Sequence, residues 1–317
     1  MAVALWAKPL LDVGPPPAPN RTLEANRRRL ARLRTTILRD AASTTPWWLH
    51  ADTIAEAARQ LRTSDFFLLD GFQGADAAVQ LRHEIEAAHT AGQLTRGRTG
   101  PTARAASLLR TDASAGFRLT AASSAPRAMR AFVRRTDALV ASLRAALRRP
   151  HAAPLLRHAE WRAAELMVSC FAANRSRYVR HTDNVCRAGV GRRCNGRRLT
   201  VVGYLNDARD DPTDGALRLY FAGSPTSAPR VDIEPLQDRL VVFWSDERVP
   251  HEVLPTSFMR FAATMWYFDS LEASQSSASK RSGGFEVREA RTVRKNVHTS
   301  AGVLPVDTLN SSFTLNK

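Results

Sequence analysis

Three side chains in the second half of the chain have the types and spacing of a metal site. His181 and Asp183 are two residues apart in the segment Arg177–Asn184. In an extended chain, residues at positions i and i+2 project to the same face. His251, which follows the apolar run Leu240–Trp244, offers a third ligand. Two histidines and one carboxylate on one side of a metal ion leave the opposite positions open, a ligand set typical of non-haem Fe(II) sites.

The order of a His-x-Asp pair, a distant His and an Arg nine residues later, Arg260, resembles a known family. Together with Tyr204–Asn206, four blocks carry the resemblance: Met167–Phe171, Tyr178–Asn184, Asp232–Asp246 and Pro250–Asp269. These blocks span roughly a third of the chain in the family's order. On them, the sequence resembles the Fe(II)- and 2-oxoglutarate-dependent dioxygenases, and within these the oxygen-sensing prolyl 4-hydroxylases. The hypoxia-inducible-factor prolyl hydroxylases are the most similar group.

The resemblance implies a cofactor, co-substrates and a reaction. Fe(II) would be held by His181, Asp183 and His251, and the remaining positions would take 2-oxoglutarate and dioxygen. The expected reaction is hydroxylation at C4 of a prolyl residue in a protein substrate, with 2-oxoglutarate converted to succinate and carbon dioxide. L-ascorbate is expected to keep the iron reduced, and a role in oxygen sensing is implied by the same resemblance.

Other positions match the family's co-substrate pocket. Arg260 is expected to hold the far carboxylate of 2-oxoglutarate, because a guanidinium is a rigid fork that matches a carboxylate and stays charged when desolvated. An arginine at a sheet edge is the alternative. Tyr204 and Thr264 would line the pocket with their hydroxyl groups, although ordinary core packing also explains both.

Three apolar or aromatic positions complete the expected pocket. Leu217 and Trp266 would form its walls, with core packing as the alternative. Phe171 stands where the family usually has Tyr, so one hydroxyl is missing. A hydrogen bond contributes about 0.5–1.5 kcal/mol net, and we therefore expect weaker binding of the co-substrate rather than loss of function.

The pattern of apolar runs predicts the elements that position these residues. Short apolar runs separated by Gly, Pro and Asp predict strands at Leu166–Phe171, Leu199–Asn206, Ala216–Phe221, Leu240–Trp244 and Arg260–Phe268. Phe66–Asp70 predicts an earlier strand, and helical spacing predicts helices at Ala75–Ala91 and Arg127–Arg149. The predicted fold is mostly β with flanking helices: a double-stranded β-helix, or jelly roll, packed by N-terminal helices.

Four parts are predicted along the chain. They are a basic N-terminal extension (1–50), a support region of helices and strand (51–165), the dioxygenase core (166–270) and a partly disordered C-terminal tail (271–317) that contains the Ser/Gly-rich segment Ser274–Gly284. Within the support region, Thr95–Thr120 is polar and contains glycine, which predicts a loop. Arg110 and Asp112 are expected to flank the entrance to the site.

Two insertions set the chain apart from the family. Val185–Arg198 follows the predicted aspartate ligand and contains five arginines, and Asp207–Asp214 is acidic. Loops at the mouth of this scaffold select the substrate, so substrate identity stays open. We expect the basic segment to steer an acidic polypeptide toward the metal.

The formal net charge of the chain is +16, yet only Lys8, Lys280, Lys295 and Lys317 are lysines. A chain so rich in Arg and Ala can reflect coding bias, and an acidic protein partner explains the charge as well as a nucleic acid does. Residues 27–39 carry six arginines and predict a solvated basic helix, with an organelle transit segment as the alternative. Nucleic-acid binding is left open but not favoured.

The number of cysteines and the length of the apolar runs indicate the cellular compartment of the protein. Three cysteines, Cys170, Cys186 and Cys194, are too few and too irregular for a disulfide framework. A reducing compartment, cytoplasmic or nuclear, is therefore expected, and organelle import through the basic N-terminus stays open. No apolar run approaches the ~20 residues that cross a bilayer, so no membrane partner is expected.

Two other functions fit part of the pattern. An oxidative demethylase of nucleic-acid bases uses the same metal triad, but it would be expected to add aromatic base-stacking groups around the mouth. The basic segment Val185–Arg198 contains none. A non-catalytic module that binds iron or 2-oxoglutarate would be expected to have a broken triad, whereas this triad is complete.

Overall fold

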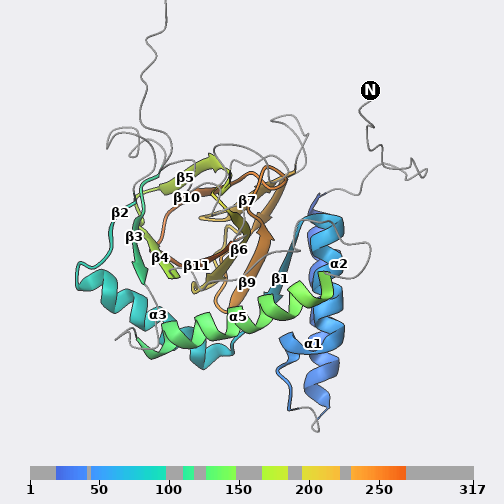
Figure 1. Ribbon diagram of the computed structural model, residues 1–317. Helices are drawn as coiled ribbons and strands as arrows, with labels where there is room; N and C mark the ends of the chain where they lie inside the picture. The colour runs from blue at the N-terminus through green and yellow to red at the C-terminus, as the bar shows by residue number, and fades with distance from the viewer. Residues whose placement is uncertain are drawn as a thin grey trace, which may run out of the picture.

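Two antiparallel β-sheets lie opposite each other at the centre of the molecule (Figure 1). The computed structural model describes residues 19–40, 44–97, 110–117, 126–147, 166–184, 195–221 and 230–268. The larger sheet has the order β1-β9-β6-β11-β4-β3-β2 and the smaller sheet the order β5-β10-β7-β8. Each neighbouring pair runs antiparallel. This arrangement confirms the predicted two-sheet, mostly β core.

The strand bounds show which sequence runs build each sheet. The larger sheet contains β1 (Phe66–Asp70), β2 (Thr95–Arg96), β3 (Ala113–Phe117), β4 (Leu166–Phe171), β6 (Arg197–Tyr204), β9 (Arg239–Trp244) and β11 (Arg260–Phe268). The smaller sheet contains β5 (Ser176–His181), β7 (Leu217–Tyr220), β8 (Arg230–Ile233) and β10 (His251–Thr256). Strand β9 is buried at all six positions, as expected for a central strand covered on both faces.

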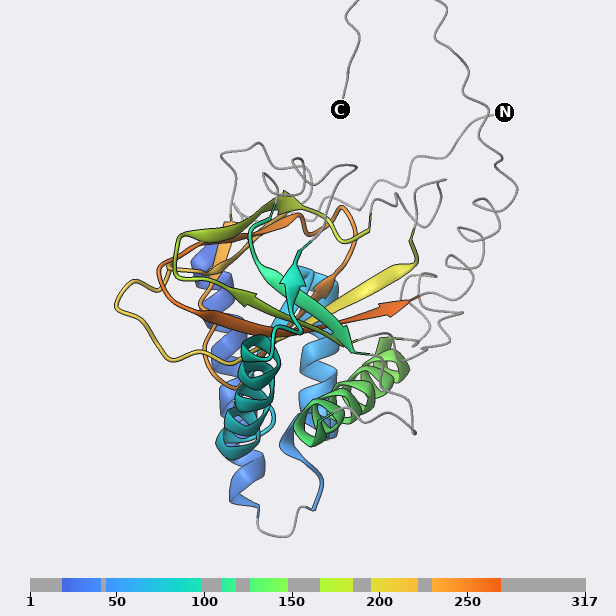
Figure 2. The ribbon, with the colours of Figure 1, turned by 90° about the vertical axis from the view of Figure 1, so that its left-hand side faces the viewer.

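Helices cover the outer face of the larger sheet, on the side away from β5 and β10 (Figures 1 and 2). They are α2 (Ala51–Ser64), α3 (Ala75–Thr90) and α5 (Arg127–Leu147), while α1 (Pro19–Arg39) packs beside α2 at the β1 edge of the sheet, next to the short 3-10 helix η1 (Trp47–Leu49). A Cβ atom placed on Gly203 of β6 would lie 2.7 Å from the Phe132 ring of α5, so the absence of a side chain there lets the helix approach the sheet. None of the described helices is long and apolar enough to cross a membrane.

Two segments differ from the predicted structure. Thr95–Thr120 was predicted as a loop, yet it contributes β2 and β3, and β3 pairs with β4 along its whole length. Its sequence, Ala-Ser-Ala-Gly-Phe, alternates apolar residues with Ser and Gly, but alanine and glycine have weak strand propensity, which backbone pairing with a strong neighbour outweighs. Arg197 and Arg198 were placed in the basic insertion but lie in β6.

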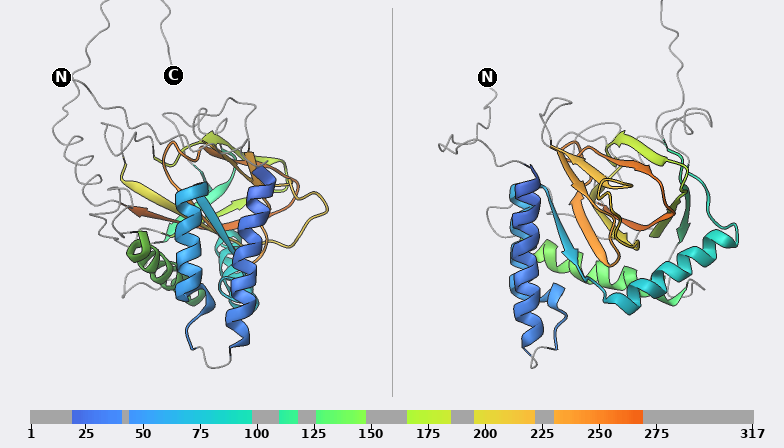
Figure 3. Two further views of the ribbon diagram at one scale, coloured as in Figure 1. Left: turned by 90° about the vertical axis from the view of Figure 1, so that its right-hand side faces the viewer. Right: turned by 180° about the vertical axis from the view of Figure 1, so that it is seen from behind.

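Helix α1 falls within the predicted N-terminal extension and packs on the core. Its Leu30 and Ile37 are 2% and 7% exposed, and it lies side by side with α2 (Figure 3). The predicted boundaries between the four parts of the chain stay a prediction. The predicted tail 271–317, including Ser274–Gly284, lies outside the described residues.

Candidate metal centre and its pocket

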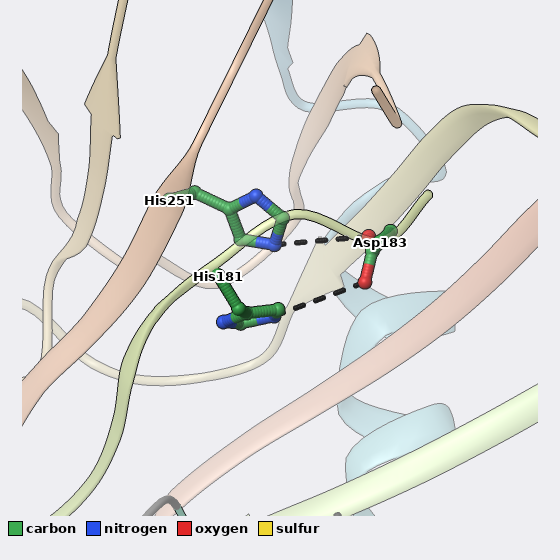
Figure 4. Close-up of side chains that lie close together, drawn as sticks. All are labelled: His181, Asp183 and His251. Carbon is green, nitrogen blue, oxygen red and sulfur yellow. Dashed lines mark ion pairs between the residues drawn. The ribbon is translucent and has the colours of Figure 1, made fainter. Parts of the chain in front are cut away.

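The smaller sheet brings His181 and His251 together, and Asp183, two residues after the end of β5, lies beside them (Figure 4). His181 ends β5 and His251 begins β10, and the two residues are direct partners in the strand register. The Nε2 atoms of His181 and His251 lie 3.8 Å and 3.7 Å from the two carboxylate oxygens of Asp183. One ligand atom from each residue lies within 4.8 Å of the others. The three predicted ligands therefore converge on a single point.

Both imidazole rings are oriented by backbone carbonyls. His181 Nδ1 lies 2.8 Å from the carbonyl oxygen of Val179, and His251 Nδ1 lies 3.1 Å from that of Val249. An Nδ1–H that donates to a carbonyl leaves the lone pair of Nε2 free for a metal ion. Burial, followed by repulsion from His251, lowers the pKa of His181 to about 4, so this ring is neutral at physiological pH.

The Asp183 carboxylate is held by a hydroxyl pair that the sequence did not reveal. Thr200 Oγ1 donates a hydrogen bond of 2.6 Å to Asp183 Oδ2, and the hydroxyl of Ser245 lies 2.9 Å from the same Thr200 oxygen. Burial raises the pKa of Asp183, but positive charge, first from His251, and the Thr200 hydrogen bond together lower it below its ordinary value. Asp183 is therefore an anion at neutral pH.

The donor set fits a divalent iron ion. Imidazole nitrogens and a carboxylate oxygen on one side of the ion are the facial arrangement of non-haem Fe(II) sites. Each first ligand is fixed by a further hydrogen bond, which is the usual pattern around protein-bound metals. His181, Asp183 and His251 could therefore hold the metal without rearrangement of their surroundings.

A cavity of about 70 Å³ begins at these three residues and runs between the sheets. Every residue predicted for the co-substrate pocket lines it: Phe171, Tyr204, Leu217, Arg260, Thr264 and Trp266. The structure leaves none of the predicted site residues elsewhere in the fold. Arg110 and Asp112 line the same cavity, and their expected place at its entrance stays a prediction.

Arg260 is a buried cation at the inner end of this cavity. Its side chain is 2% exposed, and its guanidinium carbon lies 4.9 Å and 5.0 Å from the ring centroids of Phe171 and Tyr204. Its Nε donates a hydrogen bond of 2.7 Å to the carbonyl oxygen of Gly215. Burial lowers the pKa of Arg260, and no carboxylate among the described residues lies within ion-pair distance of it.

An unpaired buried charge is costly, which points to a ligand that completes the site. Two other polar groups in the cavity support this: Tyr204 Oη and Trp266 Nε1 are buried and have no hydrogen-bond partner among the described residues. A small dicarboxylate that reaches from the metal to the guanidinium would neutralise Arg260. The chemistry of the cavity therefore fits the predicted 2-oxoglutarate.

Arg197 is a second cation at the site that the sequence placed elsewhere. Its Nη1 lies 3.9 Å from Asp183 Oδ1, and its guanidinium carbon lies 3.8 Å from the ring centroid of Trp266. Thr200 and Arg197 both precede Tyr204 in β6. Because residues two apart share one face of a strand, the alternation Thr200, Val202, Tyr204 was the signal that could have placed Thr200 in the pocket.

The chain is similar in sequence to known proteins over about a third of its length. Residues 166–268 match the model of the 2OG-Fe(II) oxygenase superfamily. The chain is 45% identical over 107 residues to the hypoxia-inducible factor prolyl hydroxylase of Caenorhabditis elegans, an alignment that covers 33% of this chain and 13% of that protein. It is 41% identical over 113 residues to human prolyl hydroxylase EGLN3, which covers 35% of this chain and 43% of that protein. The chain thus spans less than half the length of these relatives.

Solved structures agree with the fold. A prolyl hydroxylase from Trichoplax adhaerens, in complex with a peptide fragment of the hypoxia inducible factor oxygen degradation domain, has a TM-score of 0.58 and 26% identity. That alignment covers 74% of this chain and 98% of that chain. A prolyl-4-hydroxylase from Pseudomonas putida has a TM-score of 0.54 at 24% identity and covers 68% of this chain and 98% of that chain. Both relatives share the double-sheet fold.

Proposed function

We propose, from the premise that residues 166–268 form a 2OG-Fe(II) oxygenase domain, that this protein hydroxylates a prolyl residue of a protein substrate at its 4-position. 2-Oxoglutarate and dioxygen would be consumed, and succinate and carbon dioxide released with the hydroxylated product. One observation carries the proposal: a buried arginine without an acidic partner lies in the same cavity as a complete His-Asp-His triad. The similarity to prolyl hydroxylases supports a prolyl residue as the substrate.

The residues of the cavity have separate tasks in this proposal. His181, Asp183 and His251 hold Fe(II), which when bound supplies the chemistry that activates dioxygen. Arg260 binds the far carboxylate of 2-oxoglutarate, and this contact fixes the acid in the cavity with its other end toward the triad. The carboxylate takes the place of the water molecules that would otherwise solvate the guanidinium of Arg260.

Four further residues shape the co-substrate site. The hydroxyl groups of Tyr204 and Thr264 donate to the bound acid, whereas Leu217 and Trp266 form walls that exclude water. A dry site strengthens each electrostatic contact inside it and protects the activated species from side reactions. The protein therefore contributes binding, orientation and exclusion of solvent, while the cofactor supplies the oxidation.

A paired assay tests the reaction. Purified protein with Fe(II), 2-oxoglutarate and ascorbate is incubated with proline-containing peptides, and in parallel with methylated oligonucleotides. We expect succinate release with the peptides, a mass increase of one oxygen on proline, and no turnover by Asp183→Ala. Succinate release with the oligonucleotides alone would assign the demethylase function, and no release with either substrate would indicate a binding module.

The finer parts of the function are proposals of the same kind. Ascorbate would keep the iron reduced, and a KM for oxygen above working oxygen levels would make the enzyme an oxygen sensor. The T. adhaerens relative is in complex with a hypoxia inducible factor peptide, so a proline-bearing segment of a regulatory protein in the cytoplasm or nucleus is the substrate class to test. The basic segment Val185–Arg198 would attract an acidic stretch of that substrate; shortening Arg192–Arg198 should then weaken the preference for acidic peptides at low salt.

A further inference from the structure

Helix α1 has two faces of different character. Asn26, Leu30 and Ile37, which follow each other at helical spacing, form the face buried against the rest of the molecule. The opposite face is exposed and basic. Four arginines, called the arginine line below, lie along it: Arg21, Arg28, Arg32 and Arg39. Steps of seven, four and seven residues keep them in one row, which extends over about 27 Å at 1.5 Å per residue.

Two of the three remaining arginines of α1, Arg27 and Arg34, show what a structural role looks like in this helix. Arg27 donates a hydrogen bond of 2.8 Å to Asp70 at the end of β1. The guanidinium of Arg34 lies 5.7 Å from the ring centroid of Trp47. A Cβ atom on Gly71 would lie 2.5 Å from Arg34, so this arginine is also packed closely against the β1 turn. Both side chains fasten the helix to the fold.

The arginine line has no comparable role. Arg28 pairs with Glu24 at 2.7 Å, but both side chains are exposed, by 67% and 44%, and surface pairs of this kind contribute little to stability. The other three arginines of the line have no acidic side chain within ion-pair distance among the described residues. Asp40, which follows Arg39, reduces the charge only at the C-terminal end of the helix. The row is therefore a cationic surface that the fold does not use.

The position of α1 separates this surface from the cavity. The helix lies beyond the edge strand β1, whereas the cavity is lined by residues of strands on the other side of that edge (Figures 1 and 3). A membrane is a poor partner, because helices that bind a lipid surface insert an apolar face. The apolar face of α1 is already packed, and Leu38, 60% exposed, is the one large apolar side chain exposed along the described helix.

We infer that the arginine line binds the phosphate backbone of a nucleic acid without reading its sequence. The charge of the chain is +16 with a pI of about 11.1, and arginines clustered along one helix are the electrostatic footprint of nucleic-acid binding. A guanidinium matches a phosphate through two hydrogen bonds. A row of about 27 Å follows roughly eight base pairs at 3.4 Å per step. Helix α1 contains no aromatic residue to stack on bases, so the contact is limited to the backbone.

The salt dependence of binding tests this inference. The 317-residue chain is titrated into a labelled 20-base-pair DNA duplex at several salt concentrations, and log K is plotted against log[salt]. Each phosphate contact contributes about −0.9 to the slope, so R28Q/R32Q should reduce the magnitude of the slope by about 2 and weaken binding at every salt concentration. R28K/R32K keeps both charges and should keep the slope.

A matched control removes the same charge elsewhere. Arg127 and Arg134 are exposed on α5, and R127Q/R134Q should leave the slope unchanged. The inference is overturned if R28Q/R32Q leaves the slope unchanged, or if both double variants reduce it equally, since that result indicates net charge alone. It is also overturned if R28Q/R32Q weakens binding to polyglutamate, or to vesicles of anionic lipid, as much as it weakens binding to the duplex. Circular dichroism and Tm verify that each variant is folded.

Discussion

Replacing Thr200 with Val tests whether the hydroxyl pair beneath Asp183 prepares the metal site. Thr200 is 1% exposed and has nearly the shape of Val, so the substitution keeps the packing and removes the hydroxyl, with its hydrogen bond of 2.6 Å to Asp183 and its hydrogen bond of 2.9 Å with Ser245. A hydrogen bond to a charged group contributes about 1.5–3 kcal/mol. Mutation of a residue that orients a metal ligand typically lowers metal affinity by about 10–100-fold. We therefore expect Thr200→Val to weaken metal binding by one to two orders of magnitude.

The assay is an anaerobic titration of the metal-free protein with Fe(II), repeated with Mn(II). Thr200→Ser keeps the hydroxyl and should retain most of the affinity. Thr264→Val removes a hydroxyl from the same cavity that does not contact Asp183, and it should leave metal affinity unchanged. Wild-type affinity in Thr200→Val, or an equal loss in Thr264→Val, would refute the reasoning.

Three further predictions concern the charged residues Arg260 and Asp70 and the aromatic ring of Phe171. Arg260→Leu should abolish the 2-oxoglutarate-dependent rise in Tm while leaving the Tm of the ligand-free protein unchanged or higher, because it removes an unpaired buried charge. Phe171→Tyr should tighten 2-oxoglutarate binding, measured by titration, by about 0.5–1.5 kcal/mol. Burial raises the pKa of Asp70, but hydrogen bonds from Arg239 and Arg27 outweigh it and hold that pKa below its ordinary value. The wild type should therefore lose stability to urea relative to Asp70→Asn as pH falls below about 4.

Each of these outcomes can be contradicted. A lower Tm of ligand-free Arg260→Leu would mean that the guanidinium stabilises the fold through Gly215 and the two rings more than its burial costs. Unchanged affinity in Phe171→Tyr would mean that the added hydroxyl does not reach the co-substrate. The pKa of Asp70 is lower in the folded state than in the unfolded state. Its contribution to the free energy of unfolding is therefore present above the unfolded-state pKa and is lost in acid. A stability difference from Asp70→Asn that stays constant from pH 6 to pH 3 would exclude that linkage.

Much of the site was predictable because the chemistry is local in sequence. His181 and Asp183 are two residues apart in an extended segment, so their convergence needs only strand geometry. Arg260 opens a long apolar strand, and its place in the cavity follows from the same alternation that places Thr264 there. The position of His251 required the family order, since only the pairing of β10 with β5 brings it opposite His181.

The missed features depend on contacts between distant strands. Ser245 reaches Thr200 because β9 pairs with β6, and no local pattern reveals that register. Arg197 was interpreted as part of a basic loop because arginine runs usually mark solvated segments, whereas the strand begins two residues earlier than its apolar run indicates. Strand β3 alternates apolar residues over only five positions, and two of these residues are alanines, so the signal is too short and too weak to predict a strand. In each case tertiary pairing outweighs local propensity.

The acidic insertion and the buried Arg260 share one piece of backbone. Gly215 follows the insertion at once, has a φ of +64°, and accepts the hydrogen bond from Arg260 Nε. A Cβ atom at this position would lie 3.1 Å from both Arg260 and Thr256, so glycine is required by its conformation and by the space. Asp214 anchors the same turn through a hydrogen bond of 2.8 Å from the Ser257 backbone. The acidic segment Asp207–Asp214 therefore ends next to the residue that accepts the hydrogen bond from Arg260, which couples this segment to the proposed co-substrate anchor.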